Sequence, residues 1–231
     1  MHIVITGGSR GIGAEAVRRF AAQGHRVRFL YEKNHEAAKA VAAATGAEAI
    51  CCDVADKDAV MAALSGGEPV DVLINNAGIA HYGLLSQIGK EQWDRMFAVN
   101  VHGMYHCIDA VLPGMLQNQS GCIINVSSMW GQVGASCEVC YSACKAAVIG
   151  LTKALAQELG PSHIRVNCLA PGVVLTDMCK NVDAETMEFL RQETPLERHG
   201  TPADMAEAME YLINAKFLTG HVLALNGGMV L

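Results

Sequence analysis

The chain has 231 residues, of which 51% are hydrophobic, 17% charged and 5% aromatic, and its formal net charge is -6. This apolar fraction can bury a full core, which excludes a disordered chain, and the length fits a single domain over residues 1–231. The mild acidity argues against nucleic acids and anionic membranes as general partners.

Short runs rich in β-branched residues recur along the chain, with helical patterns between them. Seven of these runs are predicted strands: His2–Thr6, Arg26–Tyr31, Glu48–Cys52, Asp71–Asn75, Cys122–Val126, Arg165–Leu169 and His221–Leu225. Alternating strands and helices form a parallel sheet covered on both faces, and right-handed crossovers make it doubly wound. The predicted fold class is therefore α/β, with one Rossmann-type sheet of about seven strands.

A glycine-rich loop, Thr6–Gly13, follows the first predicted strand and opens an amphipathic helix that ends at Gly24. Gly7 permits a tight turn, Gly11 lets the backbone approach a pyrophosphate, and Gly13 lets the helix pack closely on the strand. A simple strand-to-helix turn is the alternative. The position in the first βαβ unit favours dinucleotide binding.

Two further strand ends carry residues suited to a nucleotide. Asp53-Val54 follows the third strand, where a carboxylate and a backbone N–H could bind an adenine edge, although Asp53 fits a helix N-cap equally well. Asn75-Asn76-Ala77-Gly78 follows the fourth strand. Its small residues and amides suit a wall against a ribose, or only a turn.

Tyr141 and Lys145 lie four positions apart on a predicted helix, so the phenol and the ammonium share one face. A neighbouring cation lowers the pKa of a phenol from about 10 and makes it an acid or base near neutral pH. Ser128, after the fifth strand, could donate a hydrogen bond to the same carbonyl oxygen. Asn100 could hold a water that links Lys145 to solvent. Each residue also has a plain structural interpretation, such as a core tyrosine or a kink residue.

Together these segments resemble the short-chain dehydrogenase/reductase family over essentially the whole chain. The matching segments are Thr6–Gly13, Asp53-Val54, Asn75–Gly78, Asn100, Ser128, Tyr141–Lys145, Pro171-Gly172 with Thr176, Thr219-Gly220-His221 and Asn226-Gly227-Gly228. The resemblance implies a Rossmann-type subunit, usually in a homotetramer, that binds a nicotinamide cofactor.

By position, the resemblance places Asn100, Ser128, Tyr141 and Lys145 on the family's catalytic tetrad. Tyr141 is then the acid/base, Lys145 lowers its pKa and binds the nicotinamide ribose, Ser128 polarises the carbonyl, and Asn100 holds a relay water. The implied cofactor-binding residues are Gly7, Ser9, Arg10, Gly11, Ile12, Gly13, Tyr31, Lys33, Asp53, Val54, Asn76, Ala77, Gly78, Tyr141, Lys145, Pro171, Gly172, Val174 and Thr176.

The choice of cofactor depends on the end of the second strand. An acidic residue there binds the adenosine 2′-hydroxyl and repels a 2′-phosphate, but Tyr31 occupies this place. Arg10 and Lys33 could neutralise the phosphate, whereas Glu32 opposes it. We expect NADP(H) to be favoured over NAD(H).

The resemblance is closest to 3-oxoacyl-acyl-carrier-protein reductases, which implies a small-molecule or carrier-bound ketone as substrate. The segment Lys180–Thr194, expected to cover the substrate, is short, and the net acidity does not favour docking of an acidic carrier. Ser127–Tyr141 resembles paralogues that reduce the 5-aminopentanone group on elongation factor P.

Substrate contacts are expected from Ser128, Trp130 and Glu138. The Glu138 carboxylate could pair with a substrate amine, which an acyl thioester lacks. The alternative for Glu138 is a glutamate in the first turn of a helix, favoured by the helix dipole.

The sequence also bears on a metal site and on a function without turnover. Cys137-x-x-Cys140 with Cys144 has no second Cys/His pair at ligand spacing, so no metal is expected. A dinucleotide-binding redox sensor without turnover would not need the tetrad.

The compartment and the membrane are also predicted from composition. Nine cysteines and no basic leader before the first strand favour a cytoplasmic protein. The longest uncharged stretch, Ala110 to Cys137, is too polar to span a membrane.

Overall fold

All seven predicted strands are present in the computed structural model, which describes residues 1–180 and 182–230. Each strand lies within two residues of its predicted bounds. The strands are β1 (His2–Thr6), β2 (Arg26–Tyr31), β3 (Glu48–Cys51), β4 (Val72–Asn75), β5 (Gly121–Val126), β6 (Ile164–Pro171) and β7 (Val222–Leu225).

The strands form one parallel sheet in the order β3-β2-β1-β4-β5-β6-β7, which confirms the predicted doubly wound fold. The order changes direction between β1 and β4, and in such sheets a ligand binds beyond the carboxyl ends of the strands at this point. All five residues of β1 are buried, as expected for a strand covered on both faces.

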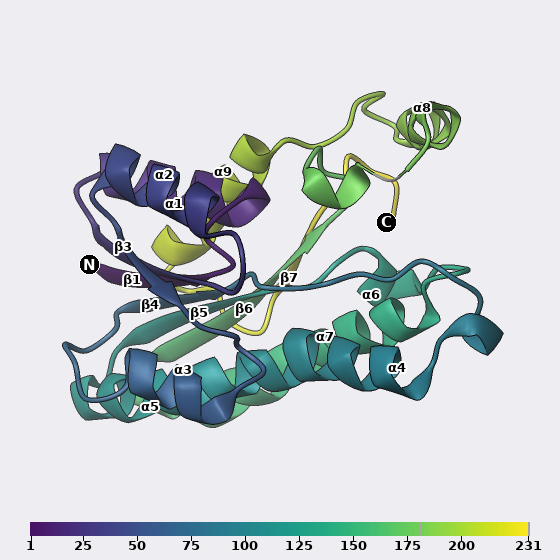
Figure 1. Ribbon diagram of the computed structural model, residues 1–231. Coiled ribbons are helices and arrows are strands. Elements are labelled where there is room, and N and C mark those ends of the chain that lie inside the picture. The colour runs from purple at the N-terminus through teal and green to yellow at the C-terminus, as the bar shows by residue number, and fades with distance from the viewer. Residues whose placement is uncertain (181, 231) are drawn as a thin grey trace.

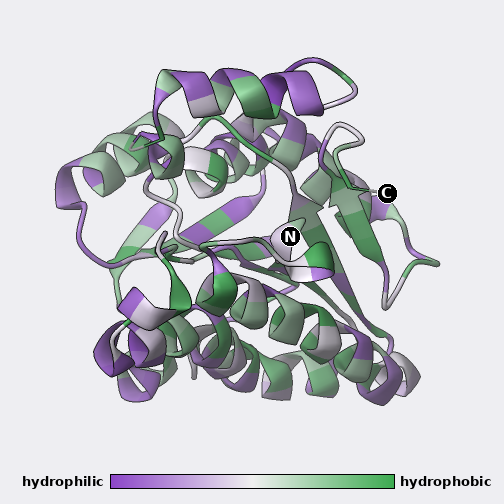
Figure 2. Ribbon diagram, turned by 90° about the vertical axis from the view of Figure 1, so that its right-hand side faces the viewer, coloured by the Kyte–Doolittle hydropathy of each residue, from purple (hydrophilic) through white to green (hydrophobic). Residues whose placement is uncertain are grey.

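Helices cover both faces of the sheet (Figure 1). One layer holds α1 (Gly11–Ala22), α2 (His35–Thr45) and α9 (Pro202–Asn214), and the other holds α3 (Lys57–Leu64), α4 (Lys90–Phe97), α5 (Gly103–Asn118) and α7 (Val139–Leu159). Figure 2 shows the apolar strands between these layers. Short elements complete the chain: η1 (Leu85–Gln87), α6 (Trp130–Val133), η3 (Gly160–Ser162), η4 (Asp177–Cys179) and α8 (Ala184–Glu193).

The apolar core is divided by the sheet into two clusters. Phe20 of α1, Phe29 of β2 and Leu212 of α9 pack on one face. Leu73 of β4 and Met115 of α5 pack on the other. Burial of both faces leaves the carboxyl edge of the sheet as the place where polar side chains gather.

Asn100 lies in a single π-helical turn, η2 (Ala98–His102), between α4 and α5. Such turns inside a helix are frequent at functional sites, because they redirect a side chain without ending the helix. The predicted kink at Asn100 therefore corresponds to a π turn.

The segment Val139–Ser162, which comprises α7 and η3, is long and apolar enough to cross a membrane by length and composition alone. This segment differs from Ala110 to Cys137, the longest uncharged stretch of the chain. Lys145 and Thr152 are buried on α7 where the helix packs beside β5 and β6. Packing on the sheet accounts for this apolar composition, as it does in other core helices.

Candidate active site

The glycine loop between β1 and α1 forms a tight backbone cradle. Gly7 and Gly11 have positive φ angles of 68° and 55°, a conformation that favours glycine. A Cβ on Gly13 would lie 2.3 Å from the Gly7 carbonyl oxygen, so the loop and the helix touch through backbone atoms. The N-cap residue Arg10 makes no side-chain capping bond, which leaves the N-terminal N–H groups of α1 available to an anion.

The end of β4 holds this loop in place. Thr6 Oγ1 accepts hydrogen bonds from the N–H groups of Asn76 and Ala77, both at 2.9 Å. Asn76 Nδ2 donates to the Thr6 carbonyl oxygen at 3.0 Å and lies 3.4 Å from that of Gly7. Asn76, predicted as a wall against the ribose, therefore uses its amide to position the glycine loop.

Three candidate residues converge at the end of β5. Lys145 Nζ donates to the Val126 carbonyl oxygen at 2.9 Å and lies 5.5 Å from the centre of the Tyr141 ring. Ser128 Oγ accepts a hydrogen bond from the Trp130 N–H at 3.2 Å, so its own hydrogen is free to be donated elsewhere. The predicted i, i+4 relation of Tyr141 and Lys145 is present on α7.

The electrostatics of this cluster differ from the expectation that Lys145 lowers the Tyr141 pKa. Burial and then the Glu138 carboxylate raise the pKa of Tyr141, and the Ser128 side chain lowers it only in part. Burial lowers the pKa of Lys145 to about 8. Desolvation is the largest cause for both groups and disfavours both charged forms.

The side chain of Asn100 is bound to the backbone of Ile79, and its predicted role of holding a relay water stays a prediction. Its Oδ1 accepts from the Ile79 N–H at 3.1 Å, and its Nδ2 donates to the Ile79 carbonyl oxygen at 2.9 Å. A Cβ on Gly78 would lie 2.8 Å from Asn100 Oδ1 and 3.4 Å from Lys145 Nζ. Both groups of the amide thus fix the loop after β4 beside Lys145.

The backbone of α7 is anchored at Lys145 by residues that the sequence analysis did not single out. Ser127 Oγ donates to the Lys145 carbonyl oxygen at 2.7 Å. A Cβ on Gly131 would lie 2.7 Å from that same oxygen, so α6 and α7 meet without a side chain between them. Two turns beyond, Asn125 Nδ2 donates to Thr152 Oγ1 at 3.0 Å. In the sequence, the only signal for this contact is the pair Ser127-Ser128 at the end of β5.

At the ends of β2 and β3, an arginine joins two carboxylates. Arg95 Nη1 donates to Asp53 Oδ2 at 2.8 Å, and Nη2 donates to Glu32 Oε1 at 3.1 Å. The N-cap of α3 is Asp56, so the alternative of an N-cap at Asp53 is wrong. No local pattern in the sequence marks Arg95, because its partners are 42 and 63 positions away.

The charge state of Asp53 reflects these contacts. Partial burial raises its pKa, but the hydrogen bonds from Arg95 and the Ala55 N–H, with the charges of Arg95 and Lys33, outweigh burial and lower the pKa overall. Asp53 therefore carries a negative charge at neutral pH.

The other residues predicted to choose the cofactor lie nearby. Lys33 Nζ lies 2.9 Å from Glu32 Oε1, and Arg10 Nη1 lies 3.7 Å from Asp177 Oδ2. Tyr31 is next to His35, with its hydroxyl 3.2 Å from Nδ1. Both predicted phosphate ligands are therefore paired with partly exposed carboxylates, and water can compete for such pairs.

A cleft of about 430 Å³ is lined by Gly11 of the glycine loop and by residues of η4 and α8. Gly11 and Thr176 both line it and lie in contact, since a Cβ on Gly11 would lie 3.3 Å from Thr176 Cγ2. Met187 lines it from α8, which lies within the predicted covering segment Lys180–Thr194. Residue 181 of that segment lies outside the described residues.

The residues after β6 extend the same edge. The Pro171 carbonyl oxygen accepts from the Met129 N–H at 2.9 Å, next to Ser128. A Cβ on Gly172 would lie 2.7 Å from Asn226 Cα. Val174 is buried and forms an isolated parallel bridge with Gly200. The structure therefore brings the predicted residues after β6 to the carboxyl edge.

Glu138 is a half-buried carboxylate beside Tyr141. It is the N-cap residue of α7, yet its side chain makes no capping hydrogen bond. Within residues 1–180 and 182–230, its carboxylate has no hydrogen-bond or ion-pair partner. Burial raises the pKa of Glu138. The alternative of a glutamate favoured by the dipole at the start of the helix stays open, because that effect needs no capping hydrogen bond.

The nine cysteines are free thiols. Among the described residues, no group of three or more His, Cys, Asp or Glu side chains is placed to hold a metal ion. Cys140 and Cys144 are buried, and burial raises the pKa of Cys144 to about 12. In the described part of the chain, Cys137, Cys140 and Cys144 therefore do not form a set of metal ligands.

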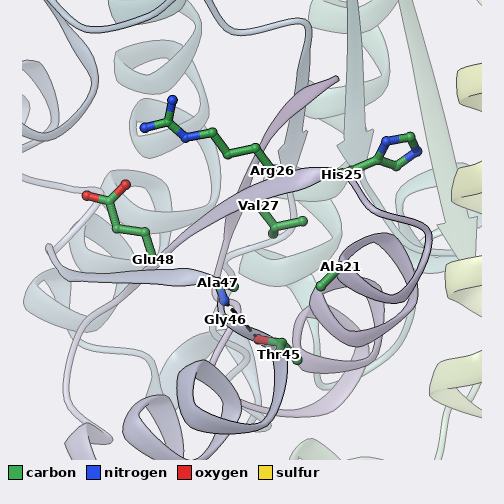
Figure 3. A pocket seen from close by; sticks show the side chains of 8 residues that line it. All are labelled: Ala21, His25, Arg26, Val27, Thr45, Gly46, Ala47 and Glu48. Carbon is green, nitrogen blue, oxygen red and sulfur yellow. Dashed lines mark hydrogen bonds between the residues drawn. The ribbon is translucent and has the colours of Figure 1, made fainter.

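A second cavity, of about 250 Å³, lies at the opposite, amino ends of β2 and β3 (Figure 3). Arg26 and His25 point in different directions there, and Glu48 starts β3. None of the residues predicted to bind cofactor or substrate lines this cavity. The carboxyl edge is therefore the candidate active site.

The comparisons with known proteins agree with this geometry. A family model described as short chain dehydrogenase matches residues 1–187. The 3-oxoacyl-[acyl-carrier-protein] reductase FabG of Staphylococcus aureus is 39% identical, and the alignment covers 98% of this chain and 96% of that protein. An oxidoreductase of Bacillus subtilis, YmfI, is 36% identical with 97% of each chain covered.

A solved structure supports the fold independently. The 3-oxoacyl-[acyl-carrier protein] reductase of Brucella melitensis superposes with a TM-score of 0.91 at 34% identity, covering 98% of this chain and 90% of that one. These relatives point to a nicotinamide dinucleotide as cofactor. A Cβ on Gly7 or Gly13 would press against neighbouring atoms of the protein, so these glycines let the loop pack tightly at the N-terminus of α1, where a pyrophosphate can bind.

Proposed function

Because this chain belongs to the short chain dehydrogenase family, we propose that it transfers a hydride from NADPH to the ketone of a 3-oxoacyl group carried by acyl carrier protein. Family membership supports the coarser conclusion, an oxidoreductase that acts on a carbonyl or an alcohol. The observation that carries the finer proposal is the meeting of Tyr141, Lys145 and Ser128 at the end of β5.

The proposed reduction uses these residues in distinct roles. The reduced nicotinamide supplies a hydride to the carbonyl carbon. Tyr141 gives its phenolic proton to the carbonyl oxygen, so the ketone becomes an alcohol and the phenol a phenolate. The raised pKa of Tyr141 keeps the phenol protonated at neutral pH, as a proton donor must be. Ser128 donates a hydrogen bond to the same oxygen while negative charge develops there.

Lys145 stabilises the phenolate after the proton has left. One of its N–H groups is held by the Val126 carbonyl oxygen, and two remain for other acceptors, such as the nicotinamide ribose. Asn100 acts indirectly in this proposal: through Ile79 it fixes the loop that packs beside Lys145. A proton from solvent then restores the phenol.

NADPH is proposed over NADH because of the residues that line the adenosine end. Tyr31 replaces the acidic residue that would repel a 2′-phosphate. Arg10 and Lys33 are exposed cations close to that edge, and a doubly charged phosphate competes well for them against single surface carboxylates.

A second candidate substrate is a ketone that also carries an amine, such as the 5-aminopentanone group on elongation factor P. The half-buried Glu138 carboxylate beside Tyr141 favours it, because an ammonium would supply the partner that this carboxylate lacks among the described residues. Trp130 is the first residue of the short helix α6, between Ser128 and Glu138 in the chain.

The proposal is tested by NADPH oxidation with an acetoacetyl thioester. We expect turnover in the wild type and a loss of at least about a hundredfold in kcat for Tyr141→Phe, with cofactor binding retained. Tyr211→Phe, on the exposed side of α9, is the matched control and should keep full activity. Turnover that persists in Tyr141→Phe would refute the assignment, and NADPH binding without turnover of any ketone would favour the redox sensor.

The two substrate classes are separated by Glu138→Gln. For an aminated ketone, KM should rise about tenfold or more, since each factor of ten corresponds to about 1.4 kcal/mol of lost pairing. For a neutral 3-oxoacyl thioester, KM should change little. An equal change in KM for both substrates would favour the carrier-bound ketone as the substrate. The homotetramer and the cytoplasmic location remain predictions, which light scattering and cell fractionation test.

A further inference from the structure

Arg95 connects two strand ends that lie side by side in the sheet. It belongs to the last turn of α4, and its guanidinium reaches Asp53 after β3 and Glu32 after β2. Strands β2 and β3 pair directly, so these carboxylates share one corner of the carboxyl edge. In this fold the adenosine ribose lies at the end of the second strand, next to that corner.

The charges at this corner balance. Glu32 Oε1 is shared by Arg95 and Lys33, and Asp53 Oδ2 is bound by Arg95. The side chain of Lys33 is 82% exposed, whereas that of Arg95 is 37% exposed and held between two carboxylates. Lys33 is therefore free to turn toward a ligand, while Arg95 stays with its partners.

Arg95 is not needed to orient Asp53. The other carboxylate oxygen, Oδ1, already accepts the Ala55 N–H at 2.9 Å, which fixes the side chain from its own loop. The main consequence of the Arg95 contacts is electrostatic: without this cation, two partly buried negative charges would face the adenosine ribose.

We propose that Arg95 determines cofactor specificity, by neutralising Glu32 and Asp53 so that a 2′-phosphate can bind beside them while Lys33 turns to meet it. This inference rests on the proposed NADPH-dependent function and adds a residue from α4 to the specificity site. Arg95 acts through Glu32, so it is a positioning residue and not a catalytic one.

The test measures binding of two fragments of the cofactor, adenosine 2′,5′-bisphosphate and 5′-AMP, by calorimetry at fixed salt. Arg95→Met should weaken the bisphosphate by about tenfold or more and 5′-AMP by no more than about twofold. The matched control is Lys90→Met, which removes one positive charge from the same helix, where Lys90 pairs with Asp94. It should leave the ratio of the two affinities unchanged.

A double-mutant cycle with Glu32→Gln identifies the mechanism. In the wild-type background, Glu32→Gln should change the affinity for the bisphosphate no more than about twofold, because Arg95 already neutralises the Glu32 charge. In the Arg95→Met background, the same substitution should restore the affinity for the bisphosphate by about tenfold. Equal losses for both fragments, or no recovery, would overturn the inference. The preference of the wild-type protein for NADPH over NADH is a separate test of the proposed function. The role of Arg95 is tested only by the change in the ratio of the two fragment affinities.

Discussion

Lys145 Nζ donates a hydrogen bond to the Val126 carbonyl oxygen over 2.9 Å, in a buried position beneath the Tyr141 ring. The ammonium keeps one good acceptor but loses most of its water, and this burial lowers its pKa to about 8.

The first prediction concerns stability. From pH 8 to 10.5 the unfolded chain keeps a proton on Lys145 that the folded chain has released, so the free energy of unfolding rises with pH. Across this pH range, the titration of Lys145 raises the free energy of unfolding by up to about 3 kcal/mol. The Lys145→Met variant lacks this gain. Its free energy of unfolding relative to the wild type, measured in urea, should therefore fall as the pH rises from 8 to 10.5. The same comparison with Lys153→Met, an exposed lysine of α7, should not change with pH.

The second prediction compares two helical glycines. Gly131→Ala places a Cβ 2.7 Å from the Lys145 carbonyl oxygen, so we expect a loss of about 1–3 kcal/mol in stability and a lower kcat. Gly150 of α7 has open space around it, and Gly150→Ala should stabilise by about 0.5–1 kcal/mol. Urea midpoints and kcat measure both. Similar effects of the two variants would show that α6 and α7 are not in tight contact.

The third prediction concerns the proton balance of Tyr141. After burial, the Glu138 carboxylate is the next cause that raises the pKa of Tyr141. Glu138→Gln should lower that pKa. Oxidation of a neutral alcohol needs the phenolate, so this activity should appear at a pH about half a unit lower, or lower still. The pH dependence of kcat/KM for oxidation measures this. Glu158→Gln, near the other end of α7, should leave the profile in place; an unshifted profile in Glu138→Gln would contradict the electrostatic coupling.

A fourth prediction concerns Arg10 and Lys33. Replacing both by Ala should weaken NADPH far more than NADH, because only NADPH carries the 2′-phosphate. The control is the double variant Arg18→Ala and Lys39→Ala, which also removes two exposed cations that pair with neighbouring glutamates. Fluorescence titration gives both dissociation constants. Equal weakening of the two cofactors would exclude these side chains as selectors.

The fifth prediction is that the purified protein contains reduced thiols and no stoichiometric zinc. Cys140 and Cys144 are buried with raised pKa values, which disfavours the thiolate that zinc requires. Elemental analysis and thiol titration of the denatured protein measure this. One zinc per chain would contradict it.

Several features of this protein could be predicted because they are local. Runs of β-branched residues mark all seven strands within two residues, since strand formation depends on near neighbours in the chain. The spacing of Tyr141 and Lys145 and the glycines before α1 also depend only on the geometry of one helix and one turn. The sequence by itself therefore determined the fold class and the family.

The tertiary structure decided what these groups do to one another. Arg95 meets Glu32 and Asp53 across 63 and 42 positions, and Asn100 meets Ile79 across 21. The raised pKa of Tyr141 and the lowered pKa of Lys145 follow from burial. Burial and long-range contacts arise from how the whole chain packs, which no local pattern encodes, so charge balance and proton affinity at the site emerge only in the folded molecule.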